Sequence, residues 1–525
     1  YFPLLFMETM LLLVTVITTI LALLIIPIPL KQIQAGGYGI FSLFRKPRFF
    51  YKRTAMLFVT SLLFVGLYFT GRRFSYSLVF SATYFAFYAL FSFVSVCAVI
   101  SGKVKNPPVY TNRLKRLYVL SGLLIIISGI VALCLLHDHR FLLYAVCAPC
   151  AAVFATAIAN IILNPFERLN NRRYVQKTKK ELAGNDCLIK IAITGSFGKT
   201  TVKNVLFSMM SERYETVKTE KNFNTPLGIA KSAKSISAET RAFIAEMGAR
   251  RRGDIKILCD VVRPQYAIIT GVTGQHLETF KTLDNVYAEK FSVLNYIPED
   301  GFCIVNRRGI EREISLPNNA FFVGGTGDFA YADEIKINSN GSNFCLYLDG
   351  KKYAAETRLL GRHNVEDIVL AAAMAKKLGV DDSDIIRAIK NLKPVPHRLE
   401  LIRNGRISII DDTYNGNPVG AKRALEVLRE FDGRRVVVTP GLVELGKREK
   451  EENEILGKEI ANVANLALII GRNGEYIGKG LIENGFPEEN ALFFKNLSDA
   501  ERFFPDLFSP NDAVLFLNDL PDELN

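Results

Sequence analysis

A glycine-rich loop between an apolar run and a helical pattern constrains the fold of this chain most. Residues 193–201 read Ile-Thr-Gly-Ser-Phe-Gly-Lys-Thr-Thr, directly after the apolar run 188–193 and before apolar residues at helical spacing. Glycines let backbone N–H groups approach an anionic phosphate at a helix N-terminus. In such a loop Lys199 can reach the β- and γ-phosphates, and the Thr200 hydroxyl can ligate Mg²⁺. The pattern predicts a strand, a phosphate-binding loop and a helix, with ATP as the ligand.

The usual form of this loop has its first glycine where this chain has Ile193. The shorter pattern Thr-Gly-x-x-Gly-Lys-Thr-Thr therefore carries the prediction. The residues that it makes candidates for nucleotide binding are Gly195, Ser196, Gly198, Lys199, Thr200 and Thr201.

The residues before this loop have the composition of a membrane region. A helix needs about 20 apolar residues to cross about 30 Å of hydrocarbon. Apolar runs near that length lie at residues 6–28, 55–70, 76–100, 117–136 and 141–163. The first run is long, lacks basic residues before it and is followed by further runs, which favours an anchor over a signal peptide. We expect an α-helical transmembrane region of about five helices over residues 1–165.

The basic residues between these runs predict an orientation. The connection 31–53 holds six Lys and Arg residues and the connection 103–116 holds five, whereas the other two hold two and one. Because cytoplasmic loops carry the excess of Lys and Arg, the N-terminus is expected outside and everything after residue 163 in the cytoplasm. ATP is available there. We therefore expect a multi-pass protein of the cell inner or plasma membrane with cytoplasmic catalytic domains.

The formal net charge of +13 does not indicate a nucleic-acid partner. Much of the excess lies near the apolar runs and in residues 168–180, where each basic side chain contributes about 1 kcal/mol near anionic headgroups. We expect a lipid bilayer as a partner and no nucleic acid. Among eight cysteines, Cys147 and Cys150 have redox-like spacing but lie inside an apolar run. We expect neither disulfides nor a zinc site.

The remaining residues read as two α/β domains, since they are too many for one ordinary core. Strand-like runs at 188–194, 242–246, 266–270 and 301–305 alternate with helical stretches such as 286–294, which predicts a mainly parallel sheet. A turn-rich stretch at 306–353 predicts a β-rich insertion, and a helix is expected at 364–378. Residues 394–397 are a plausible hinge into a second unit with strands at 407–410, 435–439, 466–470 and 513–517. The expected domains are 185–394, which binds ATP, and 395–525, which is Rossmann-like.

A series of further motifs follows the loop. The chain reads Thr-Glu-Lys-Asn-Phe-Asn-Thr-Pro-Leu-Gly at 219–228 and Ala-Glu-Met-Gly at 245–248. The later motifs lie at 274–280, 288–290, 361–364, 397–400, 411–418 and 440–446. In order and spacing they resemble the Mur ligases, the ATP-dependent amide-forming enzymes of peptidoglycan synthesis. The closest type is MurF, which adds D-alanyl-D-alanine to a UDP-linked muramoyl tripeptide. The resemblance covers approximately residues 187–525.

The resemblance implies a reaction and a set of site residues. ATP converts a carboxylate to an acyl phosphate, and an amine then displaces phosphate to give an amide. Positioning and charge stabilisation supply most of such catalysis. The resemblance implies two Mg²⁺ ions, with Thr200, Glu246, His276 and a carbamylated Lys290 as metal ligands. The catalytic residues that it implies are Lys199, Lys290, His276 and Arg398.

Other residues are assigned to ligands by the same resemblance. Asn364 is assigned to adenine, Arg398 to the phosphates across the domain cleft and Asp412 to the ribose. Asp367 stands where many relatives repeat an asparagine, so the adenine contact is expected to differ. An amino acid or dipeptide amine donor is expected at Asn222, Asn224, Tyr414, Asn415 and Asn417. Because these groups come from both domains, we expect catalysis to require closure of the cleft.

The resemblance ends at the N-terminus, where MurF-type enzymes have a small domain that recognises the UDP-sugar. The apolar runs in its place leave two interpretations: a lipid-linked or other anionic cell-wall precursor as acceptor, or an anchor beside a membrane assembly complex. The alternatives for the whole chain are an ATP-dependent poly-amino-acid synthetase and a non-catalytic membrane scaffold with a degenerate ligase domain.

Overall fold

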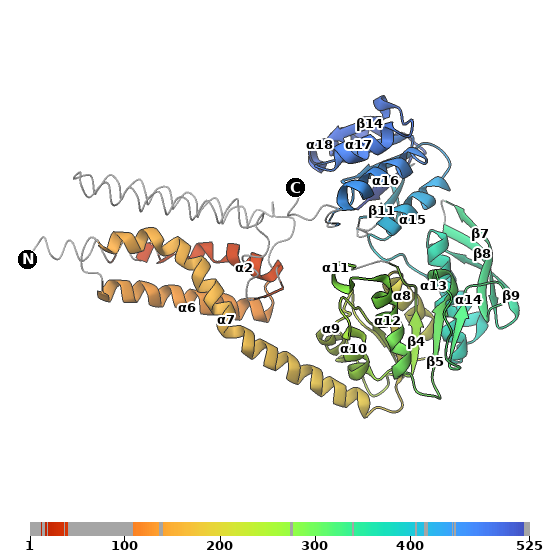
Figure 1. Cartoon of the computed structure of the whole chain (residues 1–525), viewed down its shortest axis with the longest axis horizontal. Helices are drawn as coiled ribbons and strands as arrows, with labels where there is room; N and C mark the ends of the chain where they lie inside the picture. The colour runs from red at the N-terminus through yellow and green to blue at the C-terminus, as the bar shows by residue number, and fades with distance from the viewer. Residues whose placement is uncertain are drawn as a thin grey trace, which may run out of the picture. The chain divides into compact units, whose positions relative to one another are not determined.

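The computed structural model describes residues 22–35, 37–39, 109–135, 140–273, 277–338, 341–404, 407–413, 418–443, 445 and 448–518, together with residues 12, 16, 17, 19 and 20. The contacts divide the chain into two units, Tyr1–Arg172 with Pro521–Leu524, and Arg173–Leu520 (Figure 1). The boundary expected between the membrane region and the α/β part was residue 165.

The first unit holds the helices α2 (Pro27–Ala35), α6 (Asn112–Leu135) and the first part of α7 (Arg140–Ala183). Apolar residues of these helices form one buried cluster that includes Leu30, Leu117 and Ala159. Polar contacts add to it, because Arg113 Nη2 donates to Asn164 Oδ1 at 3.0 Å. This unit is therefore an α-helical bundle in the part of the chain that the structure describes.

Among the described residues, α6 is the one helix that is long and apolar enough to cross a membrane. It holds the described part of the expected run 117–136, and the run 141–163 lies within α7. The runs 55–70 and 76–100, and most of 6–28, lie outside the described residues.

The second unit begins with a six-stranded parallel sheet in the order β2-β3-β1-β4-β5-β6. The strands expected at 188–194, 242–246, 266–270 and 301–305 are present as β1, β3, β4 and β5. Two short strands, β2 and β6, were not expected. The bounds are β1 Ile189–Thr194, β2 Thr216–Lys218, β3 Ala242–Glu246, β4 Tyr266–Ile269, β5 Phe302–Asn306 and β6 Ala320–Val323.

Helices cover both faces of this sheet. In β1, Ile191 and Ile193 join the core under α8, α13 and α14, whereas Ala192 joins the core under α9, α10 and α12. Because successive side chains of a strand point to opposite faces, a continuous apolar run fills both cores. The helices are α8 Lys199–Met210, α9 Pro226–Ala233, α10 Asp254–Val262, α12 Leu283–Phe291, α13 Arg362–Lys377 and α14 Asp382–Asn391.

The β-rich insertion begins later than expected. Three antiparallel strands, β7 (Ala330–Asn338), β8 (Gly341–Leu348) and β9 (Lys351–Thr357), form a separate sheet. Residues 306–323, expected in this insertion, instead hold a short 3₁₀ turn and β6. The prediction was wrong there because Ala320 and Val323 are buried and β6 pairs in parallel with β5 at the edge of the main sheet.

The C-terminal part is a second α/β layer structure with strand order β10-β11-β15-β12-β13-β14. All pairs are parallel except the hairpin of β10 and β11. The expected strands at 407–410, 435–439, 466–470 and 513–517 are β11, β12, β13 and β15. The bounds are β10 Glu400–Asn404, β11 Ile407–Asp412, α15 Pro418–Arg429, β12 Arg435–Thr439, α16 Glu449–Ala461, β13 Leu466–Ile470, α17 Gly474–Ile482, β14 Ala491–Phe494, α18 Leu497–Glu501, α19 Phe504–Leu507 and β15 Ala513–Leu517.

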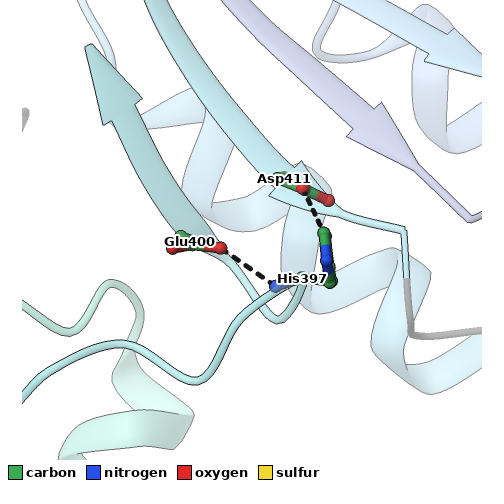
Figure 2. Close-up of side chains that lie close together, drawn as sticks. All are labelled: His397, Glu400 and Asp411. Carbon is green, nitrogen blue, oxygen red and sulfur yellow. Dashed lines mark hydrogen bonds and ion pairs between the residues drawn. The ribbon is translucent and has the colours of Figure 1, made fainter.

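The segment that leads into β10 is fastened to the end of β11 (Figure 2). His397 Nδ1 lies 2.8 Å from Asp411 Oδ2, and the His397 N–H donates to Glu400 Oε2 at 3.1 Å. The ligand atoms of these three residues lie within 4.8 Å of one another. Because these side chains bond to each other and to the backbone, we assign them a structural role, which is to hold this segment in place.

Four core clusters of described residues lie wholly inside the second unit, so this unit should fold without the apolar N-terminal region. We predict that a chain of residues 164–525 is soluble and unfolds in one or two cooperative thermal transitions followed by circular dichroism. A chain that begins at residue 185 lacks Leu182, which is buried in the core under α10. It should melt about 5 °C lower. Aggregation of both chains would contradict the autonomy of this unit.

Candidate active site

The loop between β1 and α8 has the conformation expected of a phosphate-binding loop. Gly195 and Gly198 have φ angles of 149° and 73°, and a Cβ at Gly195 would lie 2.1 Å from Thr270 Oγ1. Lys199 Nζ folds back and donates to the Gly195 carbonyl oxygen at 2.7 Å. Burial lowers the pKa of Lys199, and the charge of Glu246 opposes that shift. Backbone carbonyls of Gly195 and Ser196 thus hold this ammonium group at the loop.

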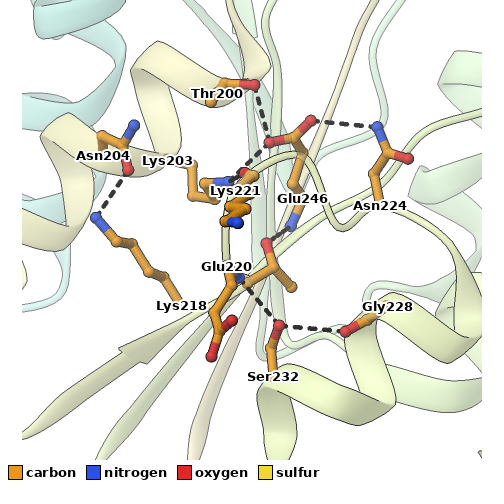
Figure 3. A network of polar contacts seen from close by, with 11 residues as sticks. Thr200, Lys203, Asn204, Lys218, Glu220, Lys221, Asn224, Gly228, Ser232 and Glu246 are labelled. Carbon is orange, nitrogen blue, oxygen red and sulfur yellow. Dashed lines mark hydrogen bonds and ion pairs between the residues drawn. The ribbon is translucent and has the colours of Figure 1, made fainter. Parts of the chain in front are cut away.

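Glu246 is the centre of a polar network at the carboxyl end of β3 (Figure 3). Its Oε2 accepts from Thr200 Oγ1 at 3.0 Å and from Lys203 Nζ at 3.0 Å. Its Oε1 accepts from Asn224 Nδ2 at 3.3 Å. The network therefore joins three candidate site residues, which come from α8, from the segment after β2 and from β3.

Lys203 is a member of this network that the sequence analysis missed. Its side chain is 1% exposed and forms an ion pair with Glu246, whose side chain is 2% exposed. Lys203 lies three residues before Leu206 and seven before Met210, so it belongs to the buried face of α8. A lysine on the apolar face of a helix beside a strand that ends in a carboxylate was the signal available in the sequence.

One cavity of about 710 Å³ gathers most of the candidates. It contains residues from the phosphate loop, from the Glu246 network, from α13 and from the C-terminal part. The candidates that line it are Ser196, Gly198, Lys199, Thr200, Thr201, Asn222, Asn224, Glu246, Asn364, Arg398 and Asp412. Residues separated by more than 200 positions in the sequence thus form one site.

Lys290 lies in a neighbouring cavity of about 380 Å³. Gly195, Ser196, Lys199 and Asn224 line this cavity too, so Ser196, Lys199 and Asn224 belong to both cavities. Lys290 is 3% exposed. Burial, reinforced by the charge of Lys199, lowers its pKa to about 7. A large fraction of this amine is therefore neutral at physiological pH, which an exposed lysine would not allow.

The residues from the C-terminal part are held by the fastened segment described above. Leu399 N–H donates to Asp412 Oδ1 at 3.2 Å, and Arg398 lies between Leu399 and the His397 pair. This ties the two candidates for the phosphates and the ribose to the end of β11.

On α13, Asn364 Nδ2 donates to the Leu360 carbonyl oxygen at 2.7 Å. Asp367 faces the phosphate loop, because a Cβ at Gly198 would lie 2.6 Å from its Oδ1. Burial raises the pKa of Asp367 well above its usual range, and the charge of Arg423 opposes that shift. The acidic residue noted in the sequence thus lines the nucleotide cavity and limits the space at Gly198.

Four of the expected site residues, His276, Tyr414, Asn415 and Asn417, lie outside the described residues. The roles assigned to them stay predictions.

The described residues fit a nucleotide with a divalent cation. The loop conformation requires glycine at two positions, as phosphate-binding loops at helix N-termini do. The hydroxyl of Thr200 and the carboxylate of Glu246 are hard oxygen donors, which Mg²⁺ prefers. Lys199 adds a cation in the same cavity.

Comparisons with known proteins agree with this geometry. The family model of the "Mur ligase middle domain" matches residues 193–375. The model of the "Mur ligase, glutamate ligase domain" matches residues 397–518. The UDP-N-acetylmuramoyl-tripeptide--D-alanyl-D-alanine ligase of Escherichia coli (strain K12) is 30% identical over 319 residues, which are 58% of this chain and 69% of that protein.

Solved structures give the same result. A crystal structure of MurF from Acinetobacter baumannii superposes on this chain with a TM-score of 0.59 at 25% identity. The alignment covers 66% of this chain and 77% of the MurF chain. The MurF ligase from Thermotoga maritima, solved in complex with ADP, has the same fold, with a TM-score of 0.57 at 22% identity over 66% of this chain and 80% of that one.

A phosphate loop that shares one cavity with the groups of a second α/β domain defines an ATP-dependent ligase with two catalytic domains. The chain belongs to the Mur ligase family. Within it the chain is an amide-bond-forming ligase of the MurF type, as the sequence motifs predicted.

The contact between Gly198 and Asp367 gives a test of the nucleotide cavity. We predict that Gly198→Ala weakens ATP binding about tenfold or more, because the added methyl group meets the Asp367 carboxylate at the phosphate loop. Gly327→Ala is the matched control, since Gly327 has a φ of 87° with open space around its Cβ position. Calorimetric titration with an ATP analogue measures both. Equal losses in the two variants would contradict the placement of the nucleotide.

Proposed function

We propose that this chain is a membrane-anchored ligase that joins an amino acid or dipeptide to a carboxylate of an anionic cell-wall precursor. The observation that carries the proposal is the position of Lys199 in the wall of two neighbouring cavities. One cavity holds the groups suited to ATP and the other holds Lys290. The name of the Escherichia coli relative, which specifies a UDP-N-acetylmuramoyl-tripeptide and D-alanyl-D-alanine, supports a precursor of this class.

The reaction that we propose proceeds through an acyl phosphate. The acceptor carboxylate attacks the γ-phosphorus of ATP, and ADP leaves. The amine of the donor then attacks the acyl carbon, phosphate leaves and an amide forms after loss of a proton. Lys199 and Arg398 line the ATP cavity, where they can hold the transferring phosphoryl group in line and balance its charge.

We place one Mg²⁺ at Thr200 and Glu246, where it would offset charge on the phosphates. A second ion would take oxygen from a carbamylated Lys290, with His276 as a further ligand. Carbamylation joins the neutral lysine amine to CO₂ with release of a proton, so it needs an unprotonated amine. Burial of Lys290 beside Lys199 favours that form. The product is an anionic oxygen ligand of the kind that Mg²⁺ prefers.

If Lys290 is carbamylated, a small carboxylate should replace it in part. We predict that Lys290→Ala lowers ligase activity at least about a hundredfold and that acetate or formate restores a measurable fraction. Lys199→Ala is the control, because a carboxylate cannot replace a lost cation. The pKa of Lys290 is about 7, so its amine is increasingly protonated below that pH and cannot hold the carbamate. Activity should therefore fall as the pH falls below about 7, and removal of CO₂ should lower it too. A Lys290→Ala activity that no carboxylate restores would count against the carbamate.

We propose that the amine donor binds near Asn222 and Asn224. Asn224 lines both cavities and Asn222 lines the ATP cavity. With the acceptor carboxylate in the cavity of Lys290, an amine at this position could attack it, since Asn224 lines that cavity too. Tyr414, Asn415 and Asn417 would complete this region.

We propose a plasma or inner membrane location with an outside N-terminus and cytoplasmic catalytic domains. The apolar face of α6 supports it, since several large side chains remain exposed along the helix: Val119 59%, Ile127 53%, Ile130 55% and Leu135 72%. Exposed apolar surface of this extent is stable in hydrocarbon and unfavourable in water. The helices would bind a lipid-linked acceptor or anchor the ligase in an assembly complex.

The test is an ADP-release assay on the full chain in detergent, with mass spectrometry of the products. Lipid-linked and UDP-linked muramoyl peptides are offered separately with D-alanyl-D-alanine and a panel of amino acids. We expect the mass of the lipid-linked acceptor to rise by that of one donor molecule less one water. A gain on the UDP-linked acceptor alone would limit the helices to anchoring. A ladder of masses would indicate a poly-amino-acid synthetase, and no turnover on any acceptor would favour a scaffold.

A further inference from the structure

A buried lysine beside a candidate metal ligand has no part in the function proposed above. Lys203 Nζ lies 3.0 Å from Glu246 Oε2, and both side chains are almost fully buried. Lys203 also donates to the Lys221 carbonyl oxygen. Taking two charges out of water is costly, so a buried ion pair is poor evidence for a role in stability alone. A leucine or methionine would fill the same face of α8 without that cost.

Three side chains hold the carboxylate of Glu246, and a fourth accepts from its backbone N–H. Thr200 and Lys203 hold Oε2, Asn224 holds Oε1, and the Glu246 N–H donates to Thr219 Oγ1 at 3.0 Å. Figure 3 shows these contacts converging on one residue. The Thr200 and Glu246 oxygens therefore already lie side by side, as joint ligands of one cation would.

We propose that Lys203 is a positioning residue that acts as an internal counter-ion for the Mg²⁺ ligand Glu246 and lowers the affinity of the site for free metal. The inference rests on the placement of Mg²⁺ at Thr200 and Glu246 in the proposed function. The ammonium group and a metal ion compete for electron density on the same Oε2 atom. Lys203 holds the Glu246 carboxylate in place, and a metal needs the added attraction of the ATP phosphates to bind well.

This role predicts that loss of Lys203 has opposite effects on folding and on metal binding. In the full chain in detergent, Lys203→Met leaves Glu246 as an uncompensated buried charge. Without metal the melting temperature should fall by about 10 °C. Free Mn²⁺, followed by electron paramagnetic resonance without nucleotide, should bind about tenfold more tightly. Mn²⁺ should also restore part of the lost melting temperature.

Lys218→Met is the matched control. Lys218 lies near this network (Figure 3), but its Nζ donates to Asn204 Oδ1 at 2.7 Å rather than to a carboxylate. The Lys218→Met variant also removes one lysine charge from this region. Its Mn²⁺ affinity should rise by no more than about twofold, which separates a direct effect on Glu246 from a change of net charge.

Three results would overturn the inference. The first is an unchanged or weaker Mn²⁺ affinity in Lys203→Met, and the second is an equal rise of affinity in Lys218→Met. The third is a Lys203→Met melting temperature that Mn²⁺ does not raise. Glu246→Gln tests the basis separately. If Mn²⁺ affinity of the native chain does not depend on Glu246, the proposed metal site fails, whatever Lys203 does.

Discussion

The parallel pairing of β1 with β3 and β4 is the constraint on which the site depends. Ile193 lies opposite Glu246, and Thr194 lies opposite Ile269. This register brings the start of the phosphate loop and the Glu246 carboxylate to one edge of the sheet, where open α/β sheets bind ligands. A slip of one residue in β3 would turn Glu246 to the other face and remove it from Thr200. Local loop chemistry matters only because this pairing holds.

The second constraint is the segment between the two catalytic domains. The His397 side chain pairs with Asp411, and the backbone N–H of Leu399 donates to Asp412. Arg398 lies between these two residues, so the chain on both sides of it is held to the end of β11. Cations from α8 and from this segment line the same cavity as carboxylates from β3, α13 and β11. Among the described residues the lining holds five Lys and Arg residues and three carboxylates, so its excess of positive charge suits a polyanionic ligand.

The features that could be predicted from the sequence are those that depend on residues close together along the chain. The loop of Gly195 and Gly198, the long strands and the order of the motifs are local patterns, and the structure places most candidates around one cavity. β2 has three residues and β6 four, too few for a periodic signal, and β6 is a strand because β5 offers it an edge. Lys203 was missed because its partner is 43 residues away and only the folded sheet brings them together.

Lys199 is in the walls of both cavities, and this has a consequence for binding. An anionic ligand in either cavity draws on the positive charge of one ammonium group, so the first anion to bind changes the field that the second one meets. Anions bound in the two cavities would therefore not bind independently. Each would change the affinity of the other by the same factor, because coupling between two binding sites is reciprocal.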